Sequence, residues 1–189
     1  MDTLSKLAQE VETCKKCPLH LNAKNSVFGE GQSNARIMFI GEAPGANEDV
    51  QGKPFVGKAG QLLTELLNTV GIKREEVFIT NVVKHRPPNN RNPTAIEVSA
   101  CTPFLEQQIS VINPEIIVPL GNYALEFVTG EKGISNLRGK IITKEIAGKT
   151  RKIIPTFHPA ALIYNRTLRP TSEKDFELIK KEANQTTLF

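Results

Sequence analysis

The sequence predicts an α/β protein with three layers, in which a central four-stranded parallel sheet carries helices on both faces. Four short apolar runs alternate along the chain with segments of helical periodicity. Strands that alternate with helices are typical of parallel sheets covered on both faces. With 189 residues, 39% of them hydrophobic, the chain is expected to form one domain, which we place at residues 1–183, followed by a tail at 184–189.

The predicted elements follow one another in a regular order. A helix over residues 4–11 precedes the first strand, and a long helix begins with a capping box formed by Thr94 and Glu97. The predicted strands are 36–40, 77–83, 116–120 and 152–156. The other predicted helices are 62–70, a short one after residue 121, and 171–183, and the stretch 130–150 is predicted to be a loop or hairpin.

Polar or glycine-containing positions follow each of the four predicted strands. Gly41 and Glu42 follow the first strand, Asn81 belongs to the second, Gly121 follows the third and His158 follows the fourth. Because the carboxyl ends of parallel strands meet at one edge, and α/β folds bind ligands there, these residues are expected to share a ligand site.

Charge and hydropathy indicate which partners and which cellular location the protein can have. The net charge of +4 permits binding to a polyanion such as DNA without requiring it. The apolar runs are far too short to span a bilayer, and the first residues lack the pattern of a secretion signal. We therefore expect a cytoplasmic protein whose cysteines stay reduced and bind metal rather than form disulfides.

Three cysteines and one histidine, Cys14, Cys17, Cys101 and His85, form a candidate metal site. A C-x2-C pair with two further ligands fits structural zinc or an iron–sulfur cluster, and the spacing leaves this choice open. Cys101 could equally be a buried helix residue, and His85 an ordinary histidine. In the C-x2-C pair, the two lysines between the cysteines favour the thiolate form and so a ligand role. Either metal would act structurally, by holding the first helix against the middle of the chain.

Four features indicate a pocket for a flat, polar ligand. The acidic loop 41–49 contains glycines that allow close approach, and the ring of Phe55, between two glycines, can stack on a ligand. The amide of Asn81 can donate and accept at the edge of a nucleobase, and His158 ends a strand. Taken singly, these residues could also be a solvated loop, a core aromatic, a turn amide and a capping histidine.

In combination, these motifs resemble the family four uracil-DNA glycosylases, the thermostable iron–sulfur type of archaea and bacteria. The matching segments, in order, are 41–49, 52–60, 80–84, 86–94 and 158–159. The resemblance implies a parallel sheet flanked by helices, a [4Fe-4S] cluster and hydrolysis of the N-glycosidic bond of deoxyuridine in DNA. We expect a monofunctional enzyme, since no lysine follows the helix-hairpin-helix pattern of a strand-nicking lyase.

The resemblance also implies a role for each matching residue. The substrate-binding residues are Gly41, Glu42, Ala43, Phe55, Asn81 and His158. Phe55 would stack on the base, Asn81 would read its edge, and His158 would stabilise the leaving uracil anion. Glu42 or Asp49 would hold the attacking water or balance the positive charge that develops on the sugar, and the sequence does not choose between them. The cluster ligands would be Cys14, Cys17, His85 and Cys101.

Two departures from the family pattern matter. The fourth cluster ligand of the family is a cysteine where this chain has His85; we expect His85 to bind iron, with an incomplete cluster as the alternative. The same position resembles the family X glycosylases, which trap uracil-DNA covalently through a downstream histidine. The stretch 88–92 has no histidine, so turnover is expected, and an inactive or covalently trapping uracil-DNA-binding protein is the alternative. Ala43 stands where family one has a water-orienting aspartate.

The remaining predictions concern DNA and partners. The predicted phosphate contacts are Lys53, Lys58, Lys84, Arg86 and Arg91. The segment 162–166 is predicted to wedge into the space of a flipped base, or else to be a buried helix start. The last residues, Gln185 to Phe189, resemble a peptide that docks on the replication sliding clamp, or form a frayed tail. We expect a nucleoid-associated monomer, and an electron carrier is disfavoured because the cysteines do not form a tight run.

Overall fold

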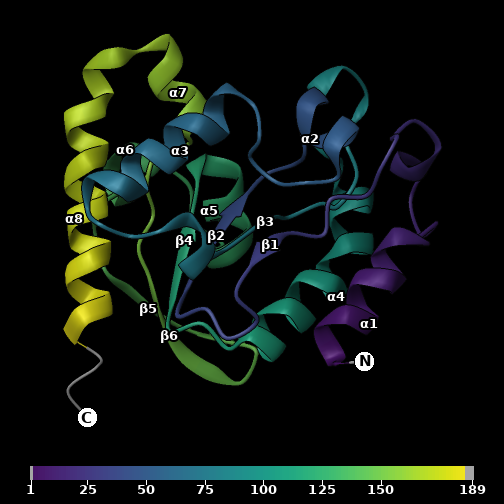
Figure 1. The fold of residues 1–189 in the computed structure, drawn as a ribbon, viewed down its shortest axis with the longest axis horizontal. Helices are drawn as coiled ribbons and strands as arrows, with labels where there is room; N and C mark the ends of the chain where they lie inside the picture. Colours follow the sequence, from purple (N-terminus) through teal and green to yellow (C-terminus); the bar gives the residue numbers. More distant parts are fainter. Residues whose placement is uncertain (1, 186–189) are drawn as a thin grey trace.

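The computed structural model describes residues 2–185, and in it a six-stranded mixed sheet lies between layers of helices (Figure 1). The strand order is β1-β3-β2-β4-β6-β5. The strands are β1 (Glu30–Gly31), β2 (Ile37–Gly41), β3 (Phe78–Asn81), β4 (Ile116–Pro119), β5 (Ile142–Ile146) and β6 (Lys149–Ile153). The predicted α/β class is confirmed, but the sheet has two more strands than the sequence predicts.

The two additional strands form the edges of the sheet, and both run antiparallel to their neighbours. β1 pairs with β3, and β5 forms a hairpin with β6. This hairpin turns at Ala147 and Gly148, whose φ angles of 50° and 72° suit a two-residue turn between twisted strands. The sequence misses β1, which has only two residues. It gives a hairpin in 130–150 only as an alternative to a loop, because β5 has no fully buried residue that would mark an apolar run.

The inner strands determine where the polar residues meet. β2 pairs in parallel with β3 and with β4, and β4 pairs in parallel with β6. The register places Gly41 beside Asn81 at the carboxyl ends of β2 and β3. A further parallel bridge joins Leu120 to Thr156, so the chain segments that follow β4 and β6 leave the same edge.

Eight α-helices within residues 2–185 surround this sheet. They are α1 (Thr3–Glu12), α2 (Ala46–Gln51), α3 (Lys58–Thr69), α4 (Ala95–Ile112), α5 (Gly121–Thr129), α6 (Ile134–Leu137), α7 (Pro159–Tyr164) and α8 (Arg169–Gln185). The capping box of α4 is confirmed, with 2.8 Å from the Thr94 nitrogen to Glu97 Oε2 and 3.4 Å from the Glu97 nitrogen to Thr94 Oγ1. The sequence misses α2 and α6, whose six and four residues are too few to show a helical period, and it gives α7 only as an alternative for the segment 162–166.

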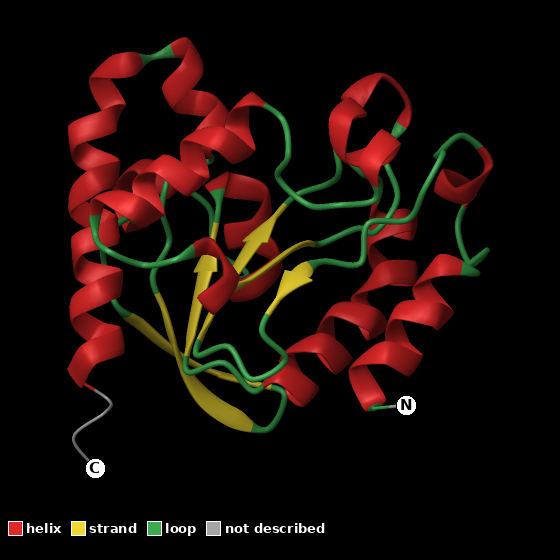
Figure 2. Ribbon diagram, in the orientation of Figure 1, coloured by secondary structure: helices red, strands yellow, loops and turns green. Residues whose placement is uncertain are grey.

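The alternation of side chains along β2 divides the core into two halves. Ile37 and Phe39 face α3 and α8, whereas Met38 and Ile40 face α4 and α5. Phe39 stacks on Phe176 of α8, with 5.7 Å between the ring centroids. Figure 2 shows the strands between α3 and α8 on one side and α4 on the other.

Helix α1 packs against α4, outside the sandwich of sheet and helices (Figure 1). Leu7 and Val11 of α1 form a small core with Phe104 of α4, and the Lys16 ammonium lies 4.8 Å from the centroid of the same ring. The first residues therefore fold back against the middle of the chain, as the candidate metal site requires.

Two further predictions concern membrane-spanning helices and the C-terminal tail. No helix within residues 2–185 is both long and apolar enough to cross a bilayer. Gln185 is the last residue of α8, and residues 186–189 of the predicted clamp-binding peptide lie outside the described residues.

Candidate active site

A cavity of about 850 Å³ opens where strands β2 and β3 end. Its walls come from the segment 42–48, the start of α3, the loop 87–92 and the residues around the start of α7. Five of the predicted substrate-binding residues line it, namely Glu42, Ala43, Phe55, Asn81 and His158. Side chains that are up to 116 positions apart in the sequence, from Glu42 to His158, thus border one space.

Gly41 lies directly behind this cavity, and its lack of a side chain is a steric requirement. A Cβ atom at Gly41 would lie 2.4 Å from Asn81 Oδ1 and 2.7 Å from Cζ of Phe55, well inside contact distance. The backbone carbonyl of Gly41 also accepts a hydrogen bond from the Val82 amide at 2.9 Å. Gly41 therefore lets the amide and the ring approach each other at the end of β2.

Asn81 lies in the wall of the cavity and carries a buried hydrogen-bond acceptor that no other described residue uses. The residue is 2% exposed, and its Oδ1 atom has no hydrogen-bond partner within residues 2–185. An unsatisfied buried acceptor costs about 1–3 kcal/mol, so native proteins rarely keep one without a reason. Because Asn81 lines the cavity, a ligand that brings an N–H group to this point would satisfy it.

Phe55 is held in a conformation that side-chain-bearing residues rarely adopt, with a φ angle of 50°. Glu48 fixes the loop that follows, because its Oε1 atom accepts hydrogen bonds from the Val56 and Gly57 amides at 2.8 and 2.9 Å. Arg74 donates to the Pro54 carbonyl at 2.7 Å on the other side. Such local strain is kept where neighbouring groups enforce it, often at functional sites.

His158 packs against Phe55 in the wall of the cavity, with 5.6 Å between the ring centroids and 34° between the ring planes. Its Nδ1 atom accepts a hydrogen bond from the Ala160 amide at 3.1 Å, which leaves the proton of the neutral ring on Nε2. Burial lowers the pKa of His158 to about 4, although Glu48 acts in the opposite direction. His158 is therefore a neutral hydrogen-bond donor at pH 7.

The three carboxylates of the acidic loop have different surroundings. Glu42 lines the cavity, and burial raises its pKa. Asp49 does not line the cavity: it is 2% exposed, and its Oδ1 atom accepts hydrogen bonds from the amides of Lys24 and Asn25 at 2.8 and 3.3 Å. The structure thus places Asp49 away from the site for which the sequence proposed it. Glu48, which the sequence analysis did not assign, lines the cavity instead.

Most of the predicted phosphate-binding side chains are engaged elsewhere. Lys84 is 1% exposed, so the prediction that it contacts DNA phosphates is wrong. Arg91 binds Glu97 through two hydrogen bonds of 2.8 and 2.7 Å and lowers the pKa of that carboxyl to about 2. Arg86 donates to Asn90 at 2.7 Å, and Lys53 lies 3.2 Å from Glu30. Lys58, at the first position of α3, lines the rim of the cavity.

The predicted wedge segment divides into a buried and an exposed part. Leu162 is 3% exposed and belongs to the core, which matches the alternative of a buried helix start. Ile163 and Tyr164 line the rim of the cavity and are 41% and 90% exposed. An aromatic side chain that is almost fully exposed at the mouth of a cavity is available to contact a ligand larger than the cavity.

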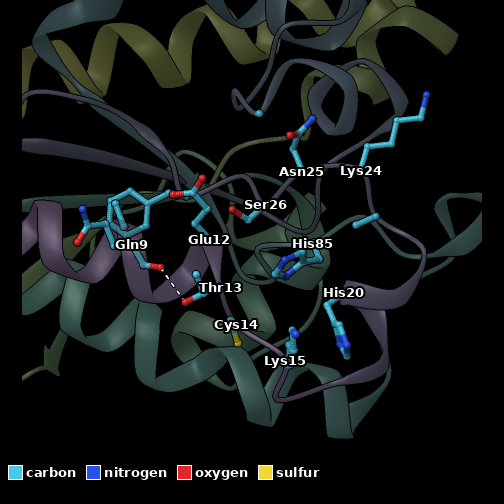
Figure 3. Close-up of a pocket in the computed structure, with 14 residues that line it drawn as sticks. Gln9, Glu12, Thr13, Cys14, Lys15, His20, Lys24, Asn25, Ser26 and His85 are labelled. Carbon is cyan, nitrogen blue, oxygen red and sulfur yellow. Dashed lines mark hydrogen bonds between the residues drawn. The ribbon is translucent and has the colours of Figure 1, made fainter.

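The cysteines lie on another side of the molecule, where α1 meets α4. A second cavity, of about 630 Å³, is bordered by Cys14, His20 and His85 (Figure 3). Cys17 and Cys101 are buried in the same core cluster, and Cys101 belongs to α4. The structure therefore brings the N-terminal cysteines to the middle of the chain, as the sequence spacing predicts.

The thiols and imidazoles on the cysteine side are close enough to shift one another's pKa. Burial raises the pKa of the Cys17 and Cys101 thiols, and neighbouring thiols raise both further. Burial lowers the pKa of His85, and His20 lowers it further, whereas Asp49 acts in the opposite direction. Within residues 2–185, no three His, Cys, Asp or Glu side chains converge as the ligands of one metal ion would. Thiolates ligate both structural zinc and iron–sulfur clusters, and the ligands of a cluster bind different iron atoms, so they need not converge on one point.

Comparisons with known proteins bear on this arrangement. A family model described as the Uracil DNA glycosylase superfamily matches residues 28–184. The chain is 50% identical over 187 residues to the Type-4 uracil-DNA glycosylase of Saccharolobus solfataricus, and the aligned segment covers 96% of this chain and 87% of that protein. It is 53% identical over 184 residues to the Type-4 enzyme of Thermotoga maritima, covering 93% and 94%. It is 31% identical over 171 residues to a Type-5 uracil-DNA glycosylase of Pyrobaculum aerophilum, covering 81% and 73%.

Proposed function

The chain belongs to the type-4 branch of the uracil-DNA glycosylase superfamily, and on this premise we propose how its cavity excises uracil from DNA. The enzyme is a DNA-repair glycosylase that hydrolyses the bond between uracil and deoxyribose and leaves an abasic site. A base within a duplex is out of reach, so the nucleotide must first rotate into the cavity. A cavity of about 850 Å³ has room for a single extruded pyrimidine together with its sugar.

The unpaired Oδ1 atom of Asn81 is the observation that carries this proposal. Uracil offers an N–H donor at N3 where cytosine has only an acceptor, so an acceptor fixed at this point favours uracil. The ring of Phe55 stands beside the same space and can stack on the base. A site built to satisfy a buried hydrogen bond rejects a ligand that lacks the matching group, because the bond is then lost.

His158 is suited to stabilise the uracil that leaves. When water attacks C1′ of the sugar, the C1′–N1 bond breaks, its electron pair stays on uracil, and the proton that the water loses ends on the products. The neutral ring of His158 can donate from Nε2 to the uracil oxygen on which negative charge develops. A donor that is already oriented toward a developing oxyanion is worth on the order of 10²–10³ in rate.

Glu42 is the carboxylate that we propose to hold the attacking water. It lines the cavity, whereas Asp49 is committed to the backbone of Lys24 and Asn25 and Glu48 to that of the Phe55 loop. Ala43 offers no side-chain base. For DNA we propose that Lys58 at the rim contacts a phosphate, and that Tyr164 enters the space of the flipped nucleotide.

We further propose that the thiols of Cys14, Cys17 and Cys101 hold a [4Fe-4S] cluster, with His85 as the fourth ligand. The mutual influence of the three thiols and their soft chemistry support this proposal. When bound, the cluster supplies structural cross-linking rather than bond cleavage. Apolar packing already holds α1, at the start of the chain, against α4 in its middle.

Other parts of the proposal concern organisation and partners. We treat residues 1–183 as one glycosylase domain and 184–189 as a tail that docks on a sliding clamp, in a monomeric protein of the cytoplasm and nucleoid. The sequence of the tail supports the docking proposal, and binding of a peptide with residues 180–189 to a purified clamp would test it.

The test of the main proposal is release of uracil from a labelled duplex with one uracil, followed by treatment with alkali. We expect alkali to cleave the strand at the uracil position, and to leave the same strand with cytosine or thymine intact. Without alkali the strand should stay whole, because no lyase activity is expected. Binding without release, or a covalent complex that survives denaturation, would instead favour the inactive or trapping alternative.

A further inference from the structure

Lys84 stands out among the lysines of residues 2–185 because it is buried, with 1% of its surface exposed. Its amino group donates hydrogen bonds to the backbone carbonyl of Asn81 at 2.6 Å and to Oγ1 of Thr80 at 2.8 Å. No salt bridge joins it to a carboxylate in the described part of the chain. Burial of a lysine without an acidic partner is costly, which points to a use for its two hydrogen bonds.

The segment from Asn81 to His85 connects the base pocket to the cysteine side. Its backbone is tied at several points: the Val82 and Val83 amides donate to the carbonyls of Gly41 and Glu42 at 2.9 and 3.2 Å. The backbone of Lys84 lies close enough to the Cys101 thiol to lower its pKa, against the larger effect of burial. The amino group of Lys84 folds back along the same segment and holds its first residue, Asn81.

The direction of the Asn81 side chain depends on this backbone. Its Oδ1 atom has no partner in the described residues, so no hydrogen bond from the protein to that atom aims it. Packing against Gly41 and the Phe55 ring limits the position of the side chain. Its remaining freedom of orientation is set by the peptide group to which it is attached. A group that holds this peptide carbonyl therefore controls where the acceptor points.

We propose that Lys84 is a positioning residue for base recognition: by binding the Asn81 carbonyl, it aims the Asn81 side chain at the base. The inference rests on the proposed function, since it takes Asn81 as the group that reads uracil. It gives Lys84 a role inside the protein in place of the predicted contact with phosphate.

The test measures binding rather than turnover, by titrating free uracil into the full-length protein. Lys84→Met keeps the length of the side chain and removes the donor. We expect this variant to bind uracil about tenfold more weakly, the equivalent of one well-placed hydrogen bond. Its affinity for DNA with a stable abasic-site analogue should stay unchanged, because no phosphate contact is altered. A general loss of structure would weaken both kinds of binding.

Thr80→Val is the matched control. It removes the other acceptor of the same amino group, together with the hydrogen bond of 2.8 Å from Thr80 Oγ1 to the Phe28 carbonyl, at nearly constant volume, but leaves the bond from Lys84 to the Asn81 carbonyl. We expect this variant to be less stable but to keep a uracil affinity within about twofold of the wild type, since neither lost bond reaches Asn81. Should Lys84→Met fail to fold by circular dichroism, Lys84→Gln makes the same comparison, because its shorter side chain does not reach the carbonyl.

Unchanged uracil binding in the Lys84 variant, or equal losses in the Lys84 and Thr80 variants, would overturn the proposal. Parallel losses of uracil and abasic-DNA binding would also overturn it, in favour of a purely structural role. Failure of the proposed function is a different result: the wild-type protein would then release no uracil from DNA, whatever the variants bind.

Discussion

The base cavity and the cysteine side of the molecule differ in what holds their side chains in place. Around the cavity, hydrogen bonds from the chain itself fix the loop after Phe55 and the ring of His158. On the cysteine side, three thiols and His85 gather through packing of α1 on α4, without converging on one point. The polypeptide thus pre-organises its cavity, whereas on its cysteine side the proposed cluster would complete the arrangement.

This difference predicts that the two regions respond differently to substitution. Changes in the cavity should lower the rate with little effect on stability, and changes on the cysteine side should do the reverse. The pair formed by Arg91 and Glu97 joins the regions, because Arg91 lines the cavity and Glu97 lies in the helix that carries Cys101.

The largest expected effect is that of His158→Ala, which removes the donor to the leaving uracil. We expect the single-turnover rate to fall on the order of 10²–10³. Because burial lowers the pKa of His158 to about 4, the wild-type ring stays neutral as the pH falls through 6.5. Rates measured between pH 5 and pH 8 should therefore show no inflection near pH 6.5. An acid limb there that disappears in His158→Ala would contradict a neutral donor.

Gly41→Ala should also act on the cavity, with a smaller effect. The added methyl would collide with the Asn81 amide and the Phe55 ring, and overpacking of this kind costs about 1–3 kcal/mol. We expect a loss of about tenfold to a hundredfold in uracil release, because the acceptor is displaced. Gly71→Ala is the control for a methyl added outside the cavity: a Cβ there meets no atom within 4 Å, so the strain of its φ angle of 65° should lower stability without changing the rate of uracil release. Wild-type rates in Gly41→Ala would show that the close approach is not needed.

Cys101→Ala tests the other region. We expect the variant to lose iron and visible absorption, and its thermal midpoint to fall by at least about 3 °C, because a buried ligand is removed. Below that midpoint, the single-turnover rate should stay within about tenfold of the wild type. Iron content, absorption and rate are measured on the same sample. A colourless, zinc-containing wild type would refute the cluster and leave the glycosylase reading intact.

The smallest effect is expected for Glu97→Gln, which weakens the bond between the regions. Arg91 holds the pKa of Glu97 at about 2, below its ordinary value of 4.5. The folded state therefore gains stability above pH 4.5, and this gain is lost as the pH falls toward 2. We expect a loss of about 1 kcal/mol at pH 7, the usual worth of a helix cap, and a smaller difference at pH 3. Denaturant titrations at the two pH values measure it.

The sequence predicts those features that depend on local patterns. The capping box of α4 follows from Thr94 and Glu97 alone, and strand ends in an α/β fold bring Asn81 and His158 together. The edge strand β1 and the helices α2 and α6 are missed because such short elements show no period. The hairpin of β5 and the helix α7 appear only as alternatives, because neither has a clear apolar pattern of its own.

The predictions for Asp49 and Lys84 fail for reasons that only the fold reveals. Glu48 and Asp49 are adjacent in α2, and adjacent residues of a helix point in different directions, so only Glu48 faces the cavity. Lys84 follows β3 in a bent segment that is buried, whereas its charge suggests a surface position. For the cysteines, the spacing identifies the donors but not their geometry.

The central claim is that Asn81 reads uracil in a cavity that the chain pre-organises. It is tested most directly by the single-turnover rate of uracil release for the wild type, Asn81→Ala and the control Asn25→Ala, whose amide binds the backbone carbonyl of Asp49 outside the cavity. We expect Asn81→Ala to be slower by on the order of 10² and the control to match the wild type. Equal rates for all three proteins would contradict the claim.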